Sequence, residues 1–130
     1  MNVLDENLFP EHAELLASWH IHSRQIGREL GRRGMLDDEI IALLHGLQRP
    51  TLFTLDSDFY RPGLRHDGYC LVWAEVAVAE LPLIIRRFLR HPTFNTEAKR
   101  LGNIVHLSLE AVHYWPLHAS QEQLVIWSAR

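Results

Sequence analysis

The sequence predicts an α/β protein, a three-layer α/β/α sandwich with a largely parallel central sheet. Short apolar runs of strand length alternate with segments of helical spacing along most of the chain. Several of these runs are apolar throughout, which is typical of parallel strands covered on both faces. With 130 residues, of which 47% are hydrophobic and 22% charged, the chain has the size of one globular unit, so we expect a single domain over residues 1–130.

The N-terminal segment predicts a strand followed by a helix. Residues 2–5 are a short apolar strand candidate that ends at Asp5. Pro10 suits the first turn of a helix that continues to about Trp19. A stripe of three residues is expected to face the core from this helix: Leu15, Leu16 and Trp19. A short extended piece is expected within residues 20–26.

The clearest helix lies in the segment "LDDEIIALLHGLQRP", residues 36–50. It opens with acidic residues and ends before Pro50. Its apolar residues follow helical spacing: Ile40, Leu43, Leu44 and Leu47. The next run, residues 51–55, is apolar and β-branched, which predicts a strand covered on both faces.

The second half of the chain repeats this alternation. A buried strand is predicted over residues 69–74, and Pro82 can begin a helix that reaches Leu89. Residues 93–102 predict a second helix that ends at Gly102, a suitable C-cap. Later strands are expected at residues 103–108 and 123–127, whereas "EAVHYW", residues 110–115, is ambiguous.

Acidic residues follow two of the predicted strands. Asp5 ends the first strand, Asp56 ends the strand over residues 51–55, and Asp58 follows two positions later. The functional crevice of a parallel sheet lies outside the carboxyl ends of its strands. These three carboxylates are therefore expected to converge at one end of the sheet.

A second set of acids starts the helix that precedes the strand at residues 51–55. This set is Asp37, Asp38 and Glu39. A helix antiparallel to its strand places its N-terminus at the strand's carboxyl end, so at least one of these acids is expected to join the cluster. Alternatively, they only complement the helix dipole.

Four carboxylates at one end of a sheet repel each other unless cations offset their charge. Oxygen ligands without cysteine suit Mg²⁺ or Mn²⁺, which retain waters and favour phosphate substrates. Such a metal can activate water and polarise a phosphoryl oxygen, so the pattern predicts phosphodiester hydrolysis. The open alternatives are that Asp56 and Asp58 only form an Asx-type turn and that Asp5 is only a capping or loop residue.

Three segments together resemble the PIN-like domains related to VapC-type toxins. They are "VLDENLFP" at residues 3–10, "GMLDDEI" at residues 34–40 and "TLFTLDSDFY" at residues 51–60. Asp5 matches the acid after the first strand, Asp37 the acid of the G-x-x-D-x-x-I pattern, and Asp56 and Asp58 the T-x-D-x-D-F pattern.

The resemblance implies a single PIN-like domain over residues 1–130 and a Mg²⁺- or Mn²⁺-dependent endoribonuclease. Its catalytic and metal-binding residues are expected to be Asp5, Asp37, Asp56 and Asp58, with Asp38 and Glu39 as additional candidates. It also implies that the protein is the toxin of a toxin–antitoxin pair, that an antitoxin protein is its partner, and that it forms a homodimer. The non-enzyme alternative is a PIN-like binding or regulatory module whose metal site is degenerate.

Basic residues are clustered locally, although the formal net charge is −3. Candidate contacts to RNA phosphates are Arg28, Arg32 and Arg33. A second cluster, Arg86, Arg87 and Arg90, lies on the helix that follows Pro82. For both clusters, a solvated surface is the alternative interpretation.

Other classes fit the sequence less well. The longest apolar runs are far below the roughly 18 residues that span a bilayer, and the N-terminus lacks the basic start of a signal peptide, so we expect a cytoplasmic protein without membrane contact. The single cysteine, Cys70, lies in an apolar run and predicts a buried thiol. A zinc site at His20 and His22 lacks a nearby third ligand. No G-x-S-x-G elbow is present, and the first strand lacks the D-x-D of haloacid-dehalogenase-like phosphatases.

Overall fold

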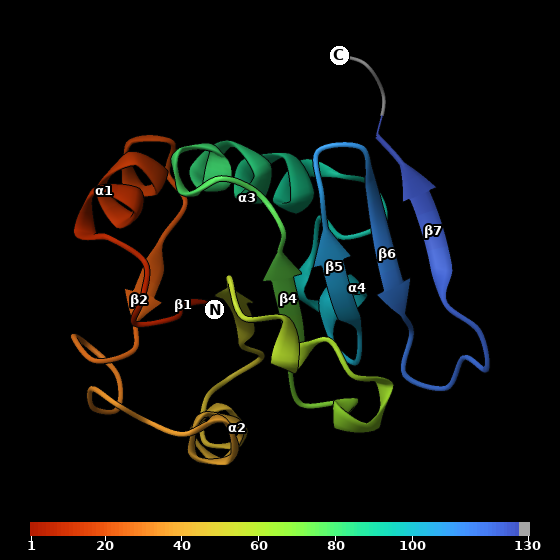
Figure 1. The fold of residues 1–130 in the computed structure, drawn as a ribbon, viewed down its shortest axis with the longest axis horizontal. Helices are drawn as coiled ribbons and strands as arrows, with labels where there is room; N and C mark the ends of the chain where they lie inside the picture. The colour runs from red at the N-terminus through yellow and green to blue at the C-terminus, as the bar shows by residue number, and fades with distance from the viewer. Residues whose placement is uncertain (128–130) are drawn as a thin grey trace.

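A seven-stranded, mostly parallel sheet organises the chain, as the computed structural model shows for residues 1–127 (Figure 1). Residues 128–130 of the expected domain lie outside the described residues. The strand order is β2-β1-β3-β4-β5-β6-β7. The strands are β1 (Asn2–Leu4), β2 (Ser23–Gln25), β3 (Thr51–Thr54), β4 (Cys70–Ala74), β5 (Ile104–Leu107), β6 (Ala111–Trp115) and β7 (Gln123–Ile126).

The first five strands in chain order are parallel, and β6 and β7 extend the sheet in antiparallel pairing. The expected largely parallel sheet is thereby confirmed. The ambiguous segment at residues 110–115 contributes strand β6, which pairs with β5 through Leu107 opposite Val112. A hairpin of this kind needs only a short connection, here Ser108 to Glu110.

Within residues 1–127, four helices accompany the sheet. They are α1 (Pro10–Ser18), α2 (Asp37–His45), α3 (Leu81–Arg90) and the single-turn α4 (Glu97–Arg100). Short 3₁₀ turns are η1 (Ser57–Phe59), η2 (Pro62–Leu64) and η3 (Val78–Glu80). Pro10 occupies the first turn of α1, as expected. Gly102 follows α4 with a φ of +88°, a left-handed conformation that favours glycine.

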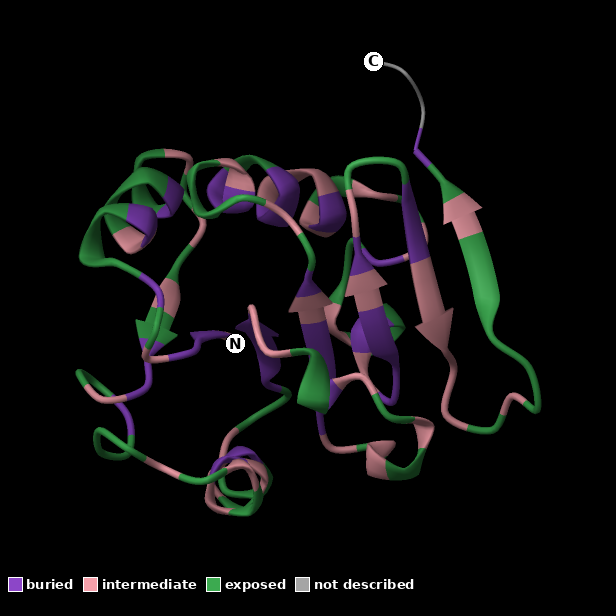
Figure 2. Ribbon diagram, in the orientation of Figure 1, coloured by how far each residue is buried: buried purple, intermediate pink, exposed green. Residues whose placement is uncertain are grey.

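Two buried clusters lie on opposite faces of the sheet because side chains alternate along each strand. Leu4, Phe53 and Val72 belong to a cluster shared with α1 and α3. Val3 and Leu52 belong to a second cluster shared with α2. Figure 1 shows α1 and α3 on one side of the sheet and α2 on the other. Burial is greatest in the central strands and least in the edge strand β7 (Figure 2).

Two details differ from expectation. Leu15 is 41% exposed, because the short helix α1 directs His12 and Leu16, which are four residues apart, towards the core. The helix expected over residues 93–102 is reduced to α4, because Thr96 caps it by accepting a hydrogen bond from the Lys99 N–H at 3.2 Å. Cys70 is buried as expected, and burial raises the pKa of its thiol to about 12.

The helices described within residues 1–127 are all too short or too polar to cross a bilayer. The longest, α3, has 10 residues.

Replacement of Phe53 by alanine is expected to destabilise the fold strongly. The side chain is fully buried in β3 and packs edge-to-face against Phe88, with ring centroids 6.0 Å apart. A buried Phe→Ala change costs about 3–5 kcal/mol in the free energy of unfolding, which denaturant titration measures. Leu124→Ala, at a side chain 54% exposed in β7, is the control and should stay within about 0.5 kcal/mol. Equal losses in both variants would contradict this description of the core.

Candidate metal centre at the carboxyl ends of the strands

Asp5 connects the ends of the neighbouring strands β1 and β3. It follows β1 directly and is 6% exposed. Its Oδ2 accepts a hydrogen bond from the Thr54 hydroxyl at 2.6 Å, and its Oδ1 accepts one from the Glu6 N–H at 2.8 Å. The Thr54 Oγ1 in turn accepts from the Asp56 N–H at 3.0 Å. Thr54 therefore joins the two acids that follow β1 and β3.

Asp56 and Asp58 form a tight turn after β3. The Asp56 Oδ1 accepts a hydrogen bond from the Asp58 N–H at 2.9 Å, and this bond starts the 3₁₀ turn η1. The Asx-type turn considered for this segment is therefore present. The same turn brings the Asp58 carboxylate beside that of Asp56, so the turn and the acid cluster occur together.

The first residue of α2 completes a group of three carboxylates. One oxygen each of Asp37, Asp56 and Asp58 lie within 4.8 Å of one another. Within residues 1–127 this is the one group of three or more His, Cys, Asp or Glu side chains close enough to hold a metal ion. The structure thus brings together three of the four expected ligands, and Asp5 lies beside the group.

The charges in this group act on each other. Burial and then the negative charges of Asp56, Asp58 and Asp5 raise the pKa of Asp37, whereas the positive charge of Arg61 opposes the shift. Proximity of like charges is the electrostatic pattern that a bound cation relieves.

The other two acids at the start of α2 have different surroundings. Asp38 is exposed, and its Oδ1 accepts a hydrogen bond from the Glu39 N–H at 3.0 Å. Glu39 accepts from the Leu36 N–H at 2.9 Å and forms an ion pair with Arg32. These contacts hold the pKa of Glu39 below its usual value. Glu39 therefore caps the helix, as in the helix-dipole interpretation, and neither Asp38 nor Glu39 belongs to the group of three.

The candidate RNA-binding arginines lie in two environments. Arg28 and Arg33 line a cleft of about 340 Å³ whose wall includes Glu6, the residue after Asp5. Arg32 is occupied by its ion pair with Glu39. The cleft therefore places two of the three cations in the same cavity wall as Glu6, the neighbour of Asp5 in the chain.

Arg61 is a candidate that sequence reasoning missed. It lines a small cavity of about 190 Å³ together with Asp37 and Asp38. Its Nε donates a hydrogen bond to the Asp58 carbonyl oxygen at 2.9 Å. The sequence does place a basic residue three positions after the second acid of "DSD". The direction of the Arg61 side chain, however, depends on the geometry of the turn.

The histidines considered for zinc do not form such a site. Residues 20–22 precede β2 instead of lying within a strand, and His20 adopts a left-handed backbone conformation with φ of 64°. A strand therefore does not place the His20 and His22 imidazoles on one side.

Comparison with known proteins finds no matching family model, curated protein or solved structure.

Replacement of Asp56 by asparagine is expected to lower the pKa of Asp37 in metal-free protein, because one of the charges that raises it is removed. NMR titration of the Asp37 carboxyl measures this shift.

The raised pKa of Asp37 also means that the folded state binds this proton more tightly than the unfolded state does. The Asp37 contribution to stability is therefore lost as pH rises from 3.8, the ordinary value, through the raised pKa.

Asp67→Asn is the matched control, because Asp67 is exposed and does not contribute to the pKa shift of Asp37. An Asp37 pKa that is the same in both variants and the parent protein would contradict the electrostatic description of the cluster.

Proposed function

We propose that this protein is a metal-dependent ribonuclease that hydrolyses RNA phosphodiester bonds with Mg²⁺ or Mn²⁺. One observation carries the proposal: the carboxylates of Asp37, Asp56 and Asp58 meet within 4.8 Å although they come from different segments. They meet beside Asp5 at the carboxyl ends of parallel strands, which is where α/β sheets place their ligands.

The chemistry of the residues fits a hard divalent cation. Asp37, Asp56 and Asp58 offer only oxygen ligands and no thiolate, which suits Mg²⁺ or Mn²⁺. When bound, such an ion supplies an activated water and polarises a phosphoryl oxygen. Asp5 is held by Thr54 and the Glu6 N–H, so we assign it to positioning the cluster and to the ion's surroundings.

Three arginines suit the RNA strand itself. Arg28 and Arg33, which line the cleft beside Glu6, are proposed to contact RNA phosphates. Arg61 lies in the cavity of Asp37 and is proposed to contact the phosphate at the cleavage site.

We further propose a PIN-like, three-layer α/β/α fold and a role as the toxin of a toxin–antitoxin pair, with an antitoxin protein as partner and a homodimer as the assembly. The support is the order of the three motifs that carry Asp5, Asp37 and the Asp56–Asp58 pair. Buried clusters on both faces of the sheet add to it.

The decisive experiment is cleavage of labelled single-stranded RNA by the purified protein with Mn²⁺, with Mg²⁺ and with EDTA. We expect cleavage with either metal and none with EDTA. Asp56→Asn should reduce the single-turnover rate by at least about a hundredfold, because loss of a ligand costs more than loss of an outer partner. Calorimetry with Mn²⁺ should show weakened binding in the same variant.

Asp67→Asn removes an equal charge outside the cluster and should cleave at the parental rate. Thermal melting of each variant shows whether the fold is retained. Absence of cleavage and of metal binding in the parent protein would reject the nuclease, leaving the Asx turn as the role of "DSD" and a binding or regulatory module as the function.

A further inference from the structure

The cleft lined by Arg28 and Arg33 begins at Glu6, the residue that follows Asp5. Its lining comes from the carboxyl ends of the neighbouring parallel strands β1 and β2 and from the loops after them. The cleft and the acid cluster therefore lie at the same end of the sheet. Its volume of about 340 Å³ is near the lower end of the roughly 300–1,000 Å³ typical of small-ligand sites, which suits a ligand of the size of one nucleotide.

An exposed aromatic ring forms part of the cleft wall. Phe9 lines the cleft and is 55% exposed. Its position is fixed, because its N–H donates to the His12 Nδ1 at 3.0 Å and its ring lies beside the buried His12 imidazole, with centroids 5.5 Å apart. Within residues 1–127, no guanidinium lies over this ring. The ring can therefore receive a planar ligand group, which a nucleobase provides.

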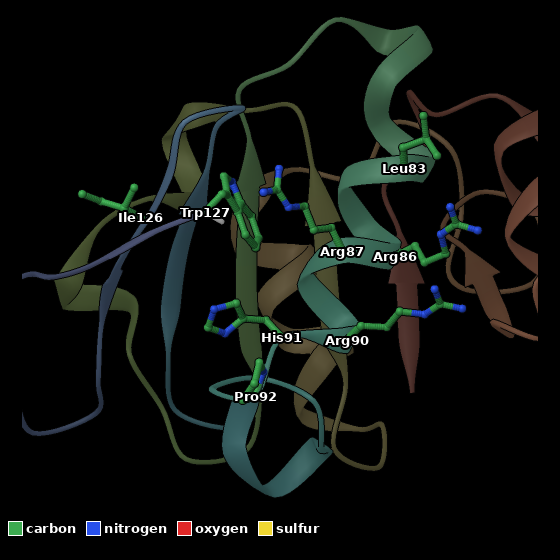
Figure 3. A pocket seen from close by; sticks show the side chains of 8 residues that line it. All are labelled: Leu83, Arg86, Arg87, Arg90, His91, Pro92, Ile126 and Trp127. Atoms are coloured by element: carbon green, nitrogen blue, oxygen red, sulfur yellow. The ribbon is translucent and has the colours of Figure 1, made fainter. Parts of the chain in front are cut away.

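The larger cavity beside α3 differs in this respect. It has a volume of about 630 Å³, and Figure 3 shows its Trp127 side chain beside that of Arg87. The Arg87 Cζ lies 4.4 Å from the centroid of the Trp127 ring, so a guanidinium already covers this ring. Of these two cavities, the cleft at Phe9 is the one with the open aromatic surface.

A buried amide in the cleft wall has an unused hydrogen-bond acceptor. Gln25 lines the cleft and is 4% exposed. Its Nε2 donates to the carbonyl oxygens of Asp5 at 3.3 Å, Glu6 at 3.4 Å and Leu8, which fixes the orientation of the amide. Within residues 1–127 its Oε1 accepts no hydrogen bond, yet protein atoms do not enclose it, because the one enclosed side-chain N or O atom without a partner there is Asn2 Oδ1. The Gln25 Oε1 thus remains for a donor on a ligand.

The charged residues of the cleft favour an anion. Within residues 1–127, neither Arg28 nor Arg33 forms an ion pair. Glu6 is the one acid among the lining residues, and both of its carboxylate oxygens accept from the Gly34 N–H, at 2.9 and 3.2 Å. Two guanidinium groups beside one hydrogen-bonded carboxylate suit a phosphate group.

We propose that this cleft binds one nucleotide of single-stranded RNA, with the base stacked on Phe9 and a base N–H donating to the Gln25 Oε1. The proposal rests on the proposed function, in which Arg28 and Arg33 contact phosphates of the same strand. Bases of a single strand are free to stack on aromatic side chains and to present their hydrogen-bonding edges. A nucleotide held here fixes the position of the strand relative to the acid cluster at the same end of the sheet.

The test of stacking measures the binding, in EDTA, of a fluorescent uridine octamer and of an octamer with the same backbone but no bases. Phe9→Ala should bind the uridine octamer at least about fivefold more weakly, because one base–aromatic contact is lost, and should bind the abasic octamer as the parent does. Phe9→Trp should restore the affinity. Leu15→Ala, at an exposed residue of the same helix outside the cleft, is the control and should leave both affinities unchanged.

The Gln25 acceptor is tested by changing the ligand, because replacing Gln25 would also remove its bonds to three backbone carbonyl groups. An octamer of N3-methyluridine keeps the charge and the rings but lacks the N–H donor. It should bind the parent protein at least about fivefold more weakly, since the acceptor is left unpaired. A 5-methyluridine octamer carries the same methyl group and keeps the N–H, so it should bind like uridine. Equal affinities for all three strands would overturn the assignment of Gln25.

Three results would overturn the stacking proposal. The first is an equal loss for both strands in Phe9→Ala, which would indicate a structural effect. The second is no loss for either strand, or no binding by the parent protein, which would leave the exposed ring to a protein partner. The third is competition by uridine monophosphate as effective as that by the unlabelled octamer, which would indicate a free nucleotide as the ligand.

The outcome is separable from that of the nuclease test. Asp56→Asn changes no residue of the cleft lining, so it should bind the uridine octamer at least as tightly as the parent protein. Binding that depends on Phe9 and on the bases, without metal-dependent cleavage by the parent, would reject the nuclease and support this site. Metal-dependent cleavage combined with unchanged binding in Phe9→Ala would reject this site alone.

Discussion

The parallel pairing of β1 with β3 is the constraint on which the candidate site depends. Leu4 lies opposite Phe53, and the Asp5 N–H donates to the Phe53 carbonyl oxygen at 3.0 Å, which extends the pairing by one step. The Thr54 hydroxyl then binds the Asp5 carboxylate. A shift of one residue in this register would exchange the two faces of β1 and move Val3 and Leu4 into the wrong clusters. The hydrophobic core therefore fixes the positions of the acids.

Structural and functional demands coincide at the carboxyl ends of the strands. Asp5 is a buried carboxylate, but two hydrogen bonds satisfy it, so its burial is compatible with its charge. Asp56 uses one carboxylate oxygen to cap the turn that presents Asp58. Burial, together with the remaining repulsion from the neighbouring acids, raises the pKa of Asp37. A local structural role for each acid does not compete with a shared role in binding a cation.

Sequence reasoning located the strands and the acids that follow them because both depend on simple rules. Continuous apolar runs mark buried strands, and parallel strands place their carboxyl ends together. The sequence pattern could not decide which of Asp37, Asp38 and Glu39 faces the acid cluster. The rotation of helix α2 and the capping contact of Glu39 decide this. Arg61 was missed because its direction is set by a 3₁₀ turn. Leu15 was expected to face the core but is exposed, because only a narrow face of the short helix α1 packs against the core.

The strand order also has a consequence for how the chain folds as it is synthesised. From β4 onward, each strand pairs with the strand that precedes it in the chain, so the sheet grows at one border in the order of translation. The first parallel pairing, of β1 with β2, can form once residue 25 has emerged, whereas the pairing of β1 with β3 has to wait for residue 53. Every intermediate of this growth carries an unpaired strand at its border, where wrong partners can attach. The final antiparallel strands, β6 and β7, extend this border through local contacts, which form faster than the parallel pairings before them.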